Sequence, residues 1–335
     1  MSNIDFIKKA ARLARANVGM AVKEAGYPKL KEAVRKLDIK LGKKVAEGAN
    51  TAIYLNNKLE KIYCRKNLCL KVFRYDDAFW GRGFAEGEGP ILESTKVQNL
   101  MALRGLAPRV YELVEVEGKI AQVCDYLEGD LYAVPISDER FEFNKKEIKM
   151  SYNFIDGKLV DFQAAVFVDY EGYRAKVLKE AQELTQWPWG GRGLYQSLSY
   201  CDGKRNTQER LKMLQFRDFK DKNVLDIGCN IGVFCREACR LGARRVVGLD
   251  IPKIVKIASE LAILDGYFNI DFYGVDLKKM TGKELKKLTG IDKFDIHLYL
   301  AMEDYLDWPD WVKNCKTLYY EGHGQVRPYK VFQYE

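Results

Sequence analysis

The segment from residue 223 to residue 250 limits the fold of this chain more than any other part of the sequence. An apolar run, Val224–Ile227, leads into a five-residue turn bounded by Gly228 and Gly232, and after a helix-like segment a second apolar run ends at Asp250. A strand, turn, helix and strand in this order place a nucleotide-like ligand at the carboxyl end of the first strand. The two glycines let the backbone turn sharply and approach that ligand closely. The Asp250 carboxylate can accept hydrogen bonds from two ribose hydroxyls.

The spacing of the glycines distinguishes between cofactors. A dinucleotide-binding turn has three glycines in the pattern G-x-G-x-x-G, whereas this turn reads G-C-N-I-G and is preceded two residues earlier by an acid, Asp226. The arrangement is similar to motif I of class I S-adenosylmethionine (SAM) methyltransferases, and the resemblance covers roughly residues 183–335. It implies that the turn with Asn230 binds the methionine part of SAM, and that Asp250 and Ile251 bind the nucleoside part. A nicotinamide-type or degenerate nucleotide fold is the alternative.

The residues that follow continue this pattern. Segment 252–265 has apolar residues at helical spacing. Three further apolar runs read as strands, at residues 270–276, 294–302 and 317–323. Strands that alternate with helices predict a parallel sheet covered on both faces. The resemblance implies that Asp276, after the third strand, lies near the adenine amino group and that Leu300, on the fourth, lines the site; for Asp276 a helix N-cap is the alternative.

The segment before motif I adds to the resemblance. Residues 187–214 contain the sequence Tyr195-Gln196-Ser, a polar loop and a helix that carries Arg210. This looks like the lead-in of a methyltransferase subgroup whose motif I also reads Asp-Ile-Gly-Cys-Asn-Ile-Gly, and there the lead-in folds over the cofactor. Tyr195, Gln196 and Arg210 are therefore candidates for a lid over SAM. The alternative is that the aromatic residues serve packing and that Arg210 lies on a helix surface.

The first half of the chain has a different pattern. Residues 45–74 read as two alternating strands and a third strand that carries Lys71, and a helix-like stretch that follows has Glu93 near its start. This order is similar to the small lobe of protein and small-molecule kinases, over roughly residues 45–175. There the strand lysine pairs with the helix glutamate and holds the phosphates of ATP. The glycine loop departs from the kinase pattern, because Gly48 stands alone.

Residues 151–163 continue the kinase resemblance. Asn153 and Asp161 look like the two magnesium ligands of a kinase, with Asp-Phe-Gln in place of Asp-Phe-Gly. However, Ile148 stands where the catalytic aspartate is expected, and phosphoryl transfer needs a group that orients the nucleophile. Three interpretations stay open: a kinase-like module that binds ATP and Mg²⁺ without efficient catalysis, an active atypical kinase, and a mistaken resemblance.

The first 45 residues carry the basic charge of the chain. They contain twelve lysines and arginines and four acidic residues, a net charge of +8 that equals the net charge of the whole sequence. Five apolar residues lie on one helical stripe: Ile7, Ala11, Ala14, Val18 and Val22. A basic amphipathic helix can contact nucleic acid or an anionic membrane. The alternative is that the stripe packs on the kinase-like lobe.

Composition sets the remaining limits. At 335 residues the chain suits two domains, and no apolar run approaches the length of a membrane-spanning helix. Charged residues close to the N-terminus argue against a signal peptide. Two histidines and eight scattered cysteines without a CxxC pair make a zinc site unexpected, and thiols of this kind fit a cytoplasmic protein. The predicted class is α/β, with a basic helical segment (1–44), an α+β kinase-like domain (45–175), a linker (176–192) and a C-terminally shortened Rossmann-like methyltransferase sheet (193–335).

Candidates for the chemistry follow the fourth and fifth strands. Methyl transfer to a hydroxyl or amine needs a group that accepts a proton, and Glu303, Asp304 and His323 are the candidates, with Tyr305 and Glu321 beside them. The acceptor stays open among a glycan, a small molecule and RNA. We expect a methyltransferase whose front half recognises substrate or binds a nucleotide. The alternatives are a bifunctional kinase–methyltransferase that acts on a glycan or another hydroxyl or phosphate acceptor, and a non-catalytic scaffold that senses SAM or a nucleotide.

The C-terminal edge of the predicted sheet needs a cover. Twelve residues follow His323 in the sequence, too few for the helix and hairpin with which the methyltransferase fold usually closes. An uncovered edge strand leaves backbone groups unpaired and favours association. We therefore expect the fifth strand to be covered by residues 326–334, by the front half or by a second subunit in a homo-oligomer.

Overall fold

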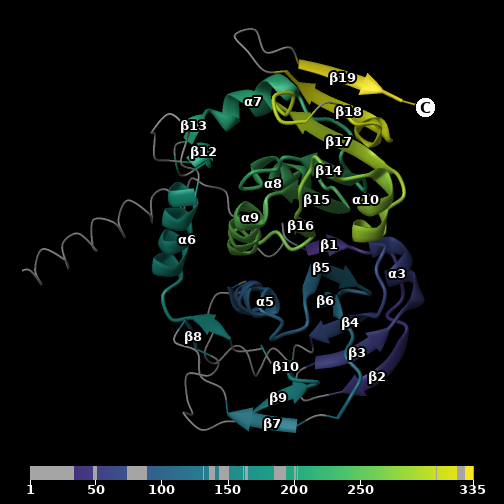
Figure 1. Cartoon of the computed structure of the whole chain (residues 1–335). Helices are drawn as coiled ribbons and strands as arrows, with labels where there is room; N and C mark the ends of the chain where they lie inside the picture. Colours follow the sequence, from purple (N-terminus) through teal and green to yellow (C-terminus); the bar gives the residue numbers. More distant parts are fainter. Residues whose placement is uncertain are drawn as a thin grey trace, which may run out of the picture.

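The computed structural model shows two six-stranded sheets, one built from each half of the chain (Figure 1). It describes residues 34–47, 51–73, 89–130, 132–135, 140–142, 151–160, 162, 165–184, 194–199, 201, 203–306, 308–322 and 329–334. The helices are α3 (Asn57–Tyr63), α5 (Gly89–Ala102), α6 (Tyr170–Leu184), α7 (Thr207–Leu214), α8 (Val233–Arg240), α9 (Pro252–Leu264), α10 (Gly282–Thr289) and the short 3-10 helix η1 (Asp310–Lys313). None of the helices in these ranges is long and apolar enough to cross a membrane.

The second half of the chain forms a sheet with the strand order β16-β15-β14-β17-β18-β19. Its strands are β14 (Asn223–Ile227), β15 (Arg245–Asp250), β16 (Ile270–Gly274), β17 (Phe294–Leu300), β18 (Cys315–Glu321) and β19 (Tyr329–Gln333). The first five pair in parallel, and β19 pairs antiparallel with β18. Buried side chains of this sheet pack under α8 and α9 on one face and under α10 and η1 on the other. The predicted parallel sheet with both faces covered is confirmed.

Strand β19 covers β18, which is one of the three coverings that the sequence predicts. Its backbone ladder ends with Glu321 opposite Tyr329. The ring of Phe332 packs edge-on against the rings of Trp308 and Tyr320, so side-chain packing fixes the strand as well as hydrogen bonding. Within the described ranges a single strand follows β18.

The first half of the chain forms a mixed sheet with the strand order β1-β5-β6-β4-β3-β2. Its strands are β1 (Val34–Lys36), β2 (Lys43–Glu47), β3 (Thr51–Leu55), β4 (Leu68–Phe73), β5 (Val110–Val116) and β6 (Lys119–Asp125). The predicted strands at residues 45–74, the last with Lys71, and the predicted helix with Glu93 are present as β2, β3, β4 and α5, and β5 and β6 follow them. The remaining strands are β7 (Tyr132–Pro135), β8 (Phe141–Glu142), β9 (Ser151–Ile155), β10 (Lys158–Leu159), β11 (Val166–Phe167), β12 (Leu194–Gln196) and β13 (Gly203–Arg205).

Two local predictions for the front half are wrong. The predicted helical segment 1–44 includes residues 34–36, which form strand β1 and pair in parallel with β5. The segment directly after β1, residues 37–41, also departs from a helix, because its buried apolar residues Leu37, Ile39 and Leu41 recur at every second position. Residues 1–33 lie outside the described ranges. Helix α3, between β3 and β4, is absent from the prediction, although Asn56 caps it by accepting a hydrogen bond from the Lys58 backbone N–H.

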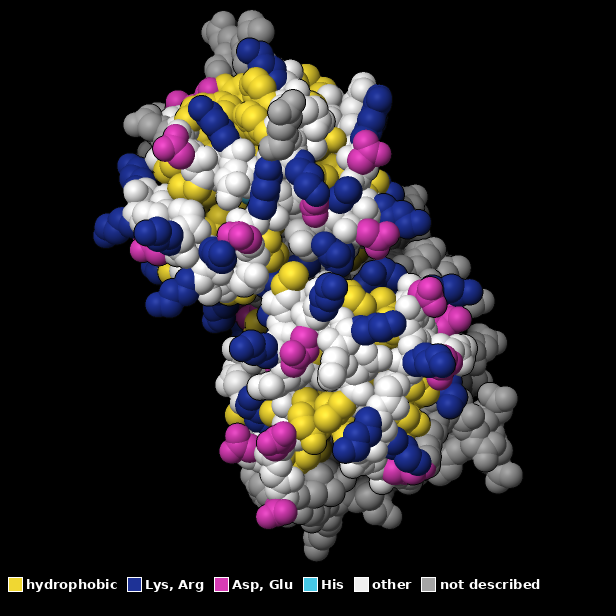
Figure 2. All heavy atoms as spheres, turned by 90° about the vertical axis from the view of Figure 1, so that its right-hand side faces the viewer, with side chains coloured by type: hydrophobic (Ala, Val, Ile, Leu, Met, Phe, Trp, Pro, Cys, Tyr) yellow, Lys and Arg dark blue, Asp and Glu magenta, His cyan; other side chains and the backbone are white. Residues whose placement is uncertain are grey.

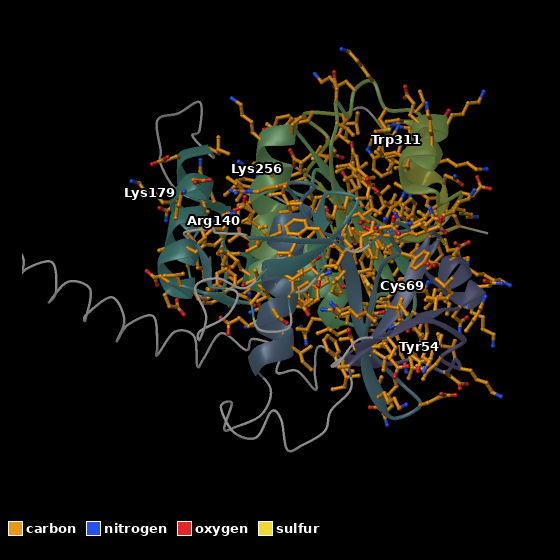
Figure 3. All side chains as sticks on the ribbon, turned by 90° about the horizontal axis from the view of Figure 1, so that it is seen from below. Tyr54, Cys69, Arg140, Lys179, Lys256 and Trp311 are labelled. Atoms are coloured by element: carbon orange, nitrogen blue, oxygen red, sulfur yellow. The ribbon has the colours of Figure 1, made fainter. Side chains whose placement is uncertain are left out.

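The two halves share one hydrophobic core. It contains side chains from α5 (Val97, Leu100), α6 (Val177, Ala181) and α9 (Leu261, Leu264). Figure 3 shows α6, marked by Lys179, beside α9, marked by Lys256. The predicted linker 176–192 is therefore wrong for residues 176–184, which are the packed second half of α6 and have their two buried residues four positions apart. Residues 185–192 lie outside the described ranges.

A buried ion cluster also joins the halves. Asp271 on β16 is 1% exposed, and its carboxylate contacts three guanidinium groups. Arg245 on β15 lies 2.8 Å from Oδ2, Arg109 before β5 lies 2.6 Å from Oδ1, and Arg65 after α3 completes the set. Burial by itself would raise the pKa of Asp271, but the three arginines hold that pKa below its usual range. Two of these arginines come from the front half, so the charge cluster links the two sheets.

Replacing Asp271 with Asn should strongly destabilise the fold, because three arginines would then surround a neutral group in a buried site. Removing one partner of a buried ion pair costs about 3–5 kcal/mol, and urea unfolding monitored by circular dichroism measures the loss. Asp292→Asn is the matched control, because the Asp292 side chain is 80% exposed where it pairs with Lys286. Its loss should stay below about 1 kcal/mol. Equal losses in the two variants would contradict the role given to Asp271.

Candidate cofactor site

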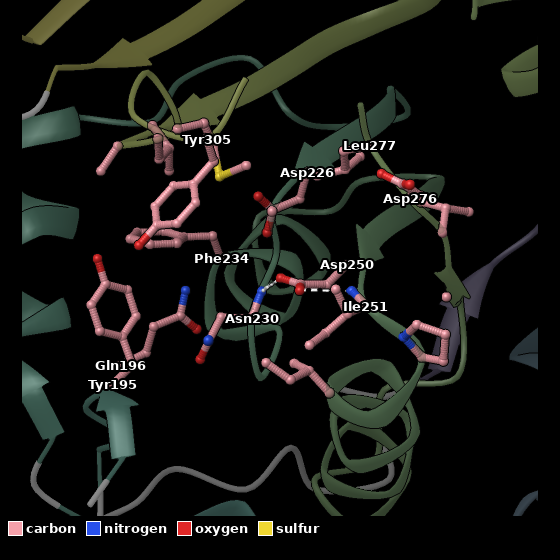
Figure 4. A pocket seen from close by; sticks show the side chains of 18 of the residues that line it. Tyr195, Gln196, Asp226, Asn230, Phe234, Asp250, Ile251, Asp276, Leu277 and Tyr305 are labelled. Carbon is pink, nitrogen blue, oxygen red and sulfur yellow. Dashed lines mark hydrogen bonds between the residues drawn. The ribbon is translucent and has the colours of Figure 1, made fainter. Parts of the chain in front are cut away.

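A pocket of about 680 Å³ lies at the carboxyl ends of strands β14, β15, β16 and β17. In the close view of Figure 4, Asp226 and Asp250 enter it from the ends of β14 and β15, and Tyr195 and Gln196 of the lead-in segment face them from the other side. Ligands of open parallel sheets bind at this edge. The pocket therefore lies where the sequence places the cofactor.

The glycine turn forms one wall of the pocket. Gly228 and Gly232 have φ angles of +74° and +75°, which L side chains rarely adopt. A side chain on Gly228 would collide with Met302, and one on Gly232 would collide with the ring of Phe272. The turn therefore needs glycine both for its backbone conformation and for space.

The Asp250 carboxylate is held in place by two backbone N–H groups. Asn230 in the glycine turn donates to Oδ2 at 2.8 Å, and Ile251 donates to Oδ1 at 2.7 Å (dashed lines in Figure 4). Burial raises the pKa of Asp250, and these two hydrogen bonds oppose that rise. Each carboxylate oxygen can accept a further hydrogen bond, so Asp250 can bind two adjacent hydroxyls of a ligand.

A second carboxylate lies deeper in the pocket. Asp226 is 2% exposed, and burial raises its pKa to about 7, although a hydrogen bond from the Cys235 thiol at 3.1 Å lowers it. Nearby, the side-chain oxygen of Gln196 accepts a hydrogen bond from the backbone N–H of Val233 at 3.3 Å. The lead-in strand β12 is thus tied to the first turn of α8, as a lid over this end of the pocket requires.

Arg210 adds a positive charge to the same end of the pocket. Its Nε donates to the fully buried carboxylate of Glu321 at 2.9 Å, and its guanidinium lies 4.7 Å from the centre of the Phe234 ring. Its Nη1 is buried and has no hydrogen-bond partner among the described residues. Arg210 lines the pocket, so its guanidinium supplies positive charge that can attract an anionic group of a ligand. The interpretation of Arg210 as a helix-surface residue is wrong, since its carboxylate partner lies inside the fold.

Aromatic and acidic residues mark opposite ends of the pocket. Tyr195 and Tyr305 lie together at one end in Figure 4, and Tyr305 is 61% exposed. The Arg205 guanidinium lies 5.1 Å from the centre of the Tyr195 ring. At the other end Asp276 is exposed and accepts a hydrogen bond from the Lys278 backbone N–H at 3.1 Å. The pocket therefore has an open aromatic mouth and a polar end.

Comparisons with known proteins point to one class of cofactor. No family model matches the sequence. A stretch of 67 residues is 40% identical to protein arginine N-methyltransferase 1 of Saccharomyces cerevisiae and covers 20% of this chain and 19% of that protein. A stretch of 88 residues is 28% identical to the ubiquinone biosynthesis O-methyltransferase of Nitrosococcus oceani and covers 26% of this chain and 34% of that protein. The chain thus spans only about a fifth to a third of the length of these relatives.

The chain contains a class I SAM-dependent methyltransferase domain. It is the part of the chain that forms the parallel sheet and the pocket. A solved structure of WbdD with a kinase inhibitor is 19% identical, covers 38% of this chain and 33% of that chain, and has a TM-score of 0.31. None of these comparisons supports the kinase-like module. The front half is a mixed β-sheet domain of unassigned type.

The methyltransferase pocket brings together ten of the eleven residues that the sequence singles out for the cofactor. They are Asp226, Gly228, Asn230, Asp250, Ile251, Asp276, Tyr195, Gln196, Arg210 and Leu300. The eleventh, Gly232, shapes the turn without lining the pocket. Asp276 is not the N-cap of α10, because Thr281 is. The prediction misses Phe234, Met302 and the three neighbours of Asp276 in its turn, which are Val275, Leu277 and Lys278. A turn directly after a parallel strand is a positional signal for ligand contact.

The three candidate proton acceptors are not brought together at the pocket. Glu303 accepts a hydrogen bond from the Tyr320 hydroxyl, and Asp304 is exposed on the turn that follows Met302. His323 lies outside the described residues. Burial lowers the pKa of the other histidine, His297, to about 4, and this ring contacts the Val312 carbonyl at 2.7 Å inside the sheet. No group of His, Cys, Asp or Glu that could hold a metal is present in the described part of the chain.

The residues assigned to a nucleotide site in the front half are placed as follows. Lys71 on β4 is buried and its ammonium donates to the Val160 carbonyl at 2.9 Å. Glu93 on α5 accepts a hydrogen bond from the Phe167 backbone N–H at 3.0 Å. Asn153 lies on β9, and Asp161 lies outside the described residues. Lys71 is therefore next to the main chain that leads into position 161.

Replacing Asp250 with Ala should weaken SAM binding about ten- to a hundredfold. The physical reason is the loss of hydrogen bonds to a charged acceptor, each group of this kind contributing roughly 1.5–3 kcal/mol. Isothermal titration calorimetry measures the dissociation constant. Asp292→Ala, which removes an exposed carboxylate outside the pocket, is the control and should bind SAM like the unmodified chain. Unchanged affinity in the Asp250 variant would overturn the assignment of the ribose site.

Proposed function

We propose that this protein transfers the methyl group of SAM to a nucleophilic atom of an acceptor. The observation that carries the proposal is the Asp250 carboxylate, held by two backbone N–H groups at the end of β15 beside the glycine turn. The likeness to methyltransferases of different acceptors supports the reaction class. It leaves the acceptor open, since one of these relatives is named for protein arginine and the other for ubiquinone biosynthesis.

The charges along the pocket match the parts of SAM. Asp250 would bind the ribose hydroxyls, and Asp276 at the polar end would lie near the adenine. At the other end Asp226 would attract the ammonium of the methionine part, and the guanidinium of Arg210 would attract its carboxylate. Gly228 lines the pocket without a side chain, so its backbone can lie close to this part of the ligand.

Bound SAM supplies an electrophilic methyl carbon on a positively charged sulfur. The protein has to align the acceptor with that carbon and exclude water. Tyr195, Phe234 and Tyr305 form the aromatic end of the pocket where an acceptor would enter. As the new bond to carbon forms, the carbon–sulfur bond breaks with its electron pair on sulfur, and a hydroxyl or amine acceptor gives up one proton. Asp304 and Glu303, on the turn beside Tyr305, are our candidates to accept it, together with His323.

The front half is proposed to recognise the substrate or to bind a nucleotide. The Lys71 ammonium donates to the carbonyl of Val160. Val160 precedes the predicted magnesium ligand Asp161 in the sequence, and this neighbour in sequence supports a nucleotide. Ile148 at the position of the catalytic aspartate argues against efficient phosphoryl transfer. A bifunctional kinase–methyltransferase is the second candidate, and it differs from the first by a measurable phosphoryl transfer.

The affinity for SAM should fall as the pH is lowered through 7. Asp226 has a pKa of about 7 because it is buried, so it is protonated below that pH and loses its attraction for the ammonium of SAM. One unit below the pKa the affinity should be weaker by up to about tenfold. Calorimetric titrations between roughly pH 8 and pH 6 measure this. The Asp226→Asn variant should show weak binding with a flat pH profile, and an equally steep profile in that variant would contradict the assignment.

The proposed function is tested by a parallel transfer assay. The protein is incubated with cell extract, RNA and glycan fractions, once with methyl-labelled SAM and once with γ-labelled ATP. We expect label from SAM on an acceptor, at least tenfold less of it with Asp250→Ala, and no transfer from ATP. Label from ATP that depends on Lys71 would favour the bifunctional enzyme. SAM binding without transfer to any acceptor fraction would favour the sensing scaffold.

A further inference from the structure

A basic surface crosses the junction of the two halves on the face that Figure 2 shows, where dark blue side chains gather between the upper and lower parts of the molecule. Two segments build it, residues 57–67 with α3 and residues 276–292 with α10. Together they contain eight lysines and four carboxylates, and all eight lysines are exposed. We call the exposed lysines of these two segments the lysine strip.

The lysine strip is continuous although its segments are far apart in the sequence. At the end of α10, a Cβ on Gly290 would lie 3.3 Å from the carbonyl oxygen of Cys64 at the end of α3. Arg65, the next residue, reaches inward to Asp271 on β16. The ion cluster that joins the two sheets therefore also holds α3 against α10, and the lysines of both helices share one surface.

The carboxylates on these segments leave most of the lysines without an acidic partner. Asp276 pairs with Lys279 at 3.4 Å, and Asp292 pairs with Lys286 at 2.9 Å. The other two carboxylates cap backbone groups: Glu284 accepts from the Thr281 N–H, and Glu60 accepts from the Asn67 N–H. No ion pair involves Lys58, Lys61, Lys66, Lys278, Lys283 or Lys287 in the described part of the chain. The lysine strip thus presents unneutralised positive charge.

The strip begins at the pocket. Lys278 is one of the residues that line it, and α10 starts four residues later. The eight residues of α10 span about 12 Å at a rise of 1.5 Å per residue, and α3 extends the row into the front half. The strip reaches the pocket at the end where Asp276 lies, opposite the aromatic end. A strand that followed it would therefore have to continue across the pocket to bring an acceptor to Tyr195 and Tyr305.

We propose that the lysine strip binds the phosphate backbone of single-stranded RNA and brings an RNA acceptor to the pocket. This inference rests on the proposed methyltransferase function and adds the class of acceptor. Rows of lysines recognise a chain of phosphates through counterion release. A membrane surface fits less well, because Leu285 and Thr289 of α10 face the protein. Leu288, 37% exposed, is then the one exposed large apolar side chain of this helix, and a single side chain does not make an apolar face for insertion. A pocket that SAM largely fills admits one unpaired residue of a strand, which favours a single strand over a duplex.

Fluorescence anisotropy with a labelled, unstructured single-stranded RNA tests the proposal. In the strip variant, Lys283→Glu and Lys287→Glu reverse two charges on α10. In the control variant, Lys176→Glu and Lys179→Glu make the same change in net charge on α6, across the molecule from Trp311 and α10 (Figure 3). We expect the strip variant to bind RNA at least tenfold more weakly and the control to change less than threefold. The slope of log affinity against log salt should fall by about 1.4 in the strip variant, since each single-strand phosphate contact contributes about 0.7.

Several outcomes would overturn this inference: no RNA binding by the unmodified chain, equal weakening in both variants, or tighter binding to duplex DNA or to anionic phosphatidylglycerol vesicles than to RNA. Calorimetric titration with SAM separates this inference from the proposed function, because both variants should bind SAM like the unmodified chain. If the unmodified chain binds SAM and transfers its methyl group but does not bind RNA, the lysine strip alone is contradicted. RNA binding through the strip without any SAM binding contradicts the methyltransferase proposal instead.

Discussion

The site depends on the two hydrogen bonds that backbone N–H groups donate to the Asp250 carboxylate. One N–H comes from Asn230 in the glycine turn and the other from Ile251 at the start of the next helix. The carboxylate therefore fixes the turn relative to β15 before any ligand arrives. This preorganisation matters because a ligand then does not have to order the turn as it binds. It also explains why Asn230 tolerates a φ angle of 51°, since the left-handed conformation points its N–H at Asp250.

Strand β16 lies beside the glycine turn of the cofactor site and also contacts the front half. The ring of Phe272 fills the space beside Gly232 and Gly248, where a side chain on either glycine would collide with it. The preceding residue, Asp271, is held by Arg65 and Arg109 of the front half. The same strand ends at Gly274 in the pocket wall. The front domain thus braces a strand of the cofactor site, so its loss would disturb the site even if it binds no ligand of its own.

The sequence predicts the parts of the structure that depend on local pattern. The apolar runs and the turn at Gly228 predict the parallel sheet and the cofactor residues, because strand ends at one sheet edge meet in space. The pairing of Arg210 with Glu321 could not be predicted, since the two residues lie 111 positions apart and either alone reads as a surface charge. The cluster around Asp271 is hidden for the same reason. Strand β1 was missed because it has only three residues and follows a predicted helical segment.

In the front half, the sequence pattern predicts the order of the strands but does not establish the function. The order of strands around Lys71 matches the prediction, yet Glu93 accepts a hydrogen bond from the backbone of Phe167, and the comparisons give no support to a kinase.

The most direct test of the central claim is a crystal structure of the protein with S-adenosylhomocysteine. Our account predicts the nucleoside at the end of β15, with both ribose hydroxyls within about 3 Å of the Asp250 carboxylate oxygens. A product bound elsewhere, or with its ribose turned away from Asp250, would contradict it.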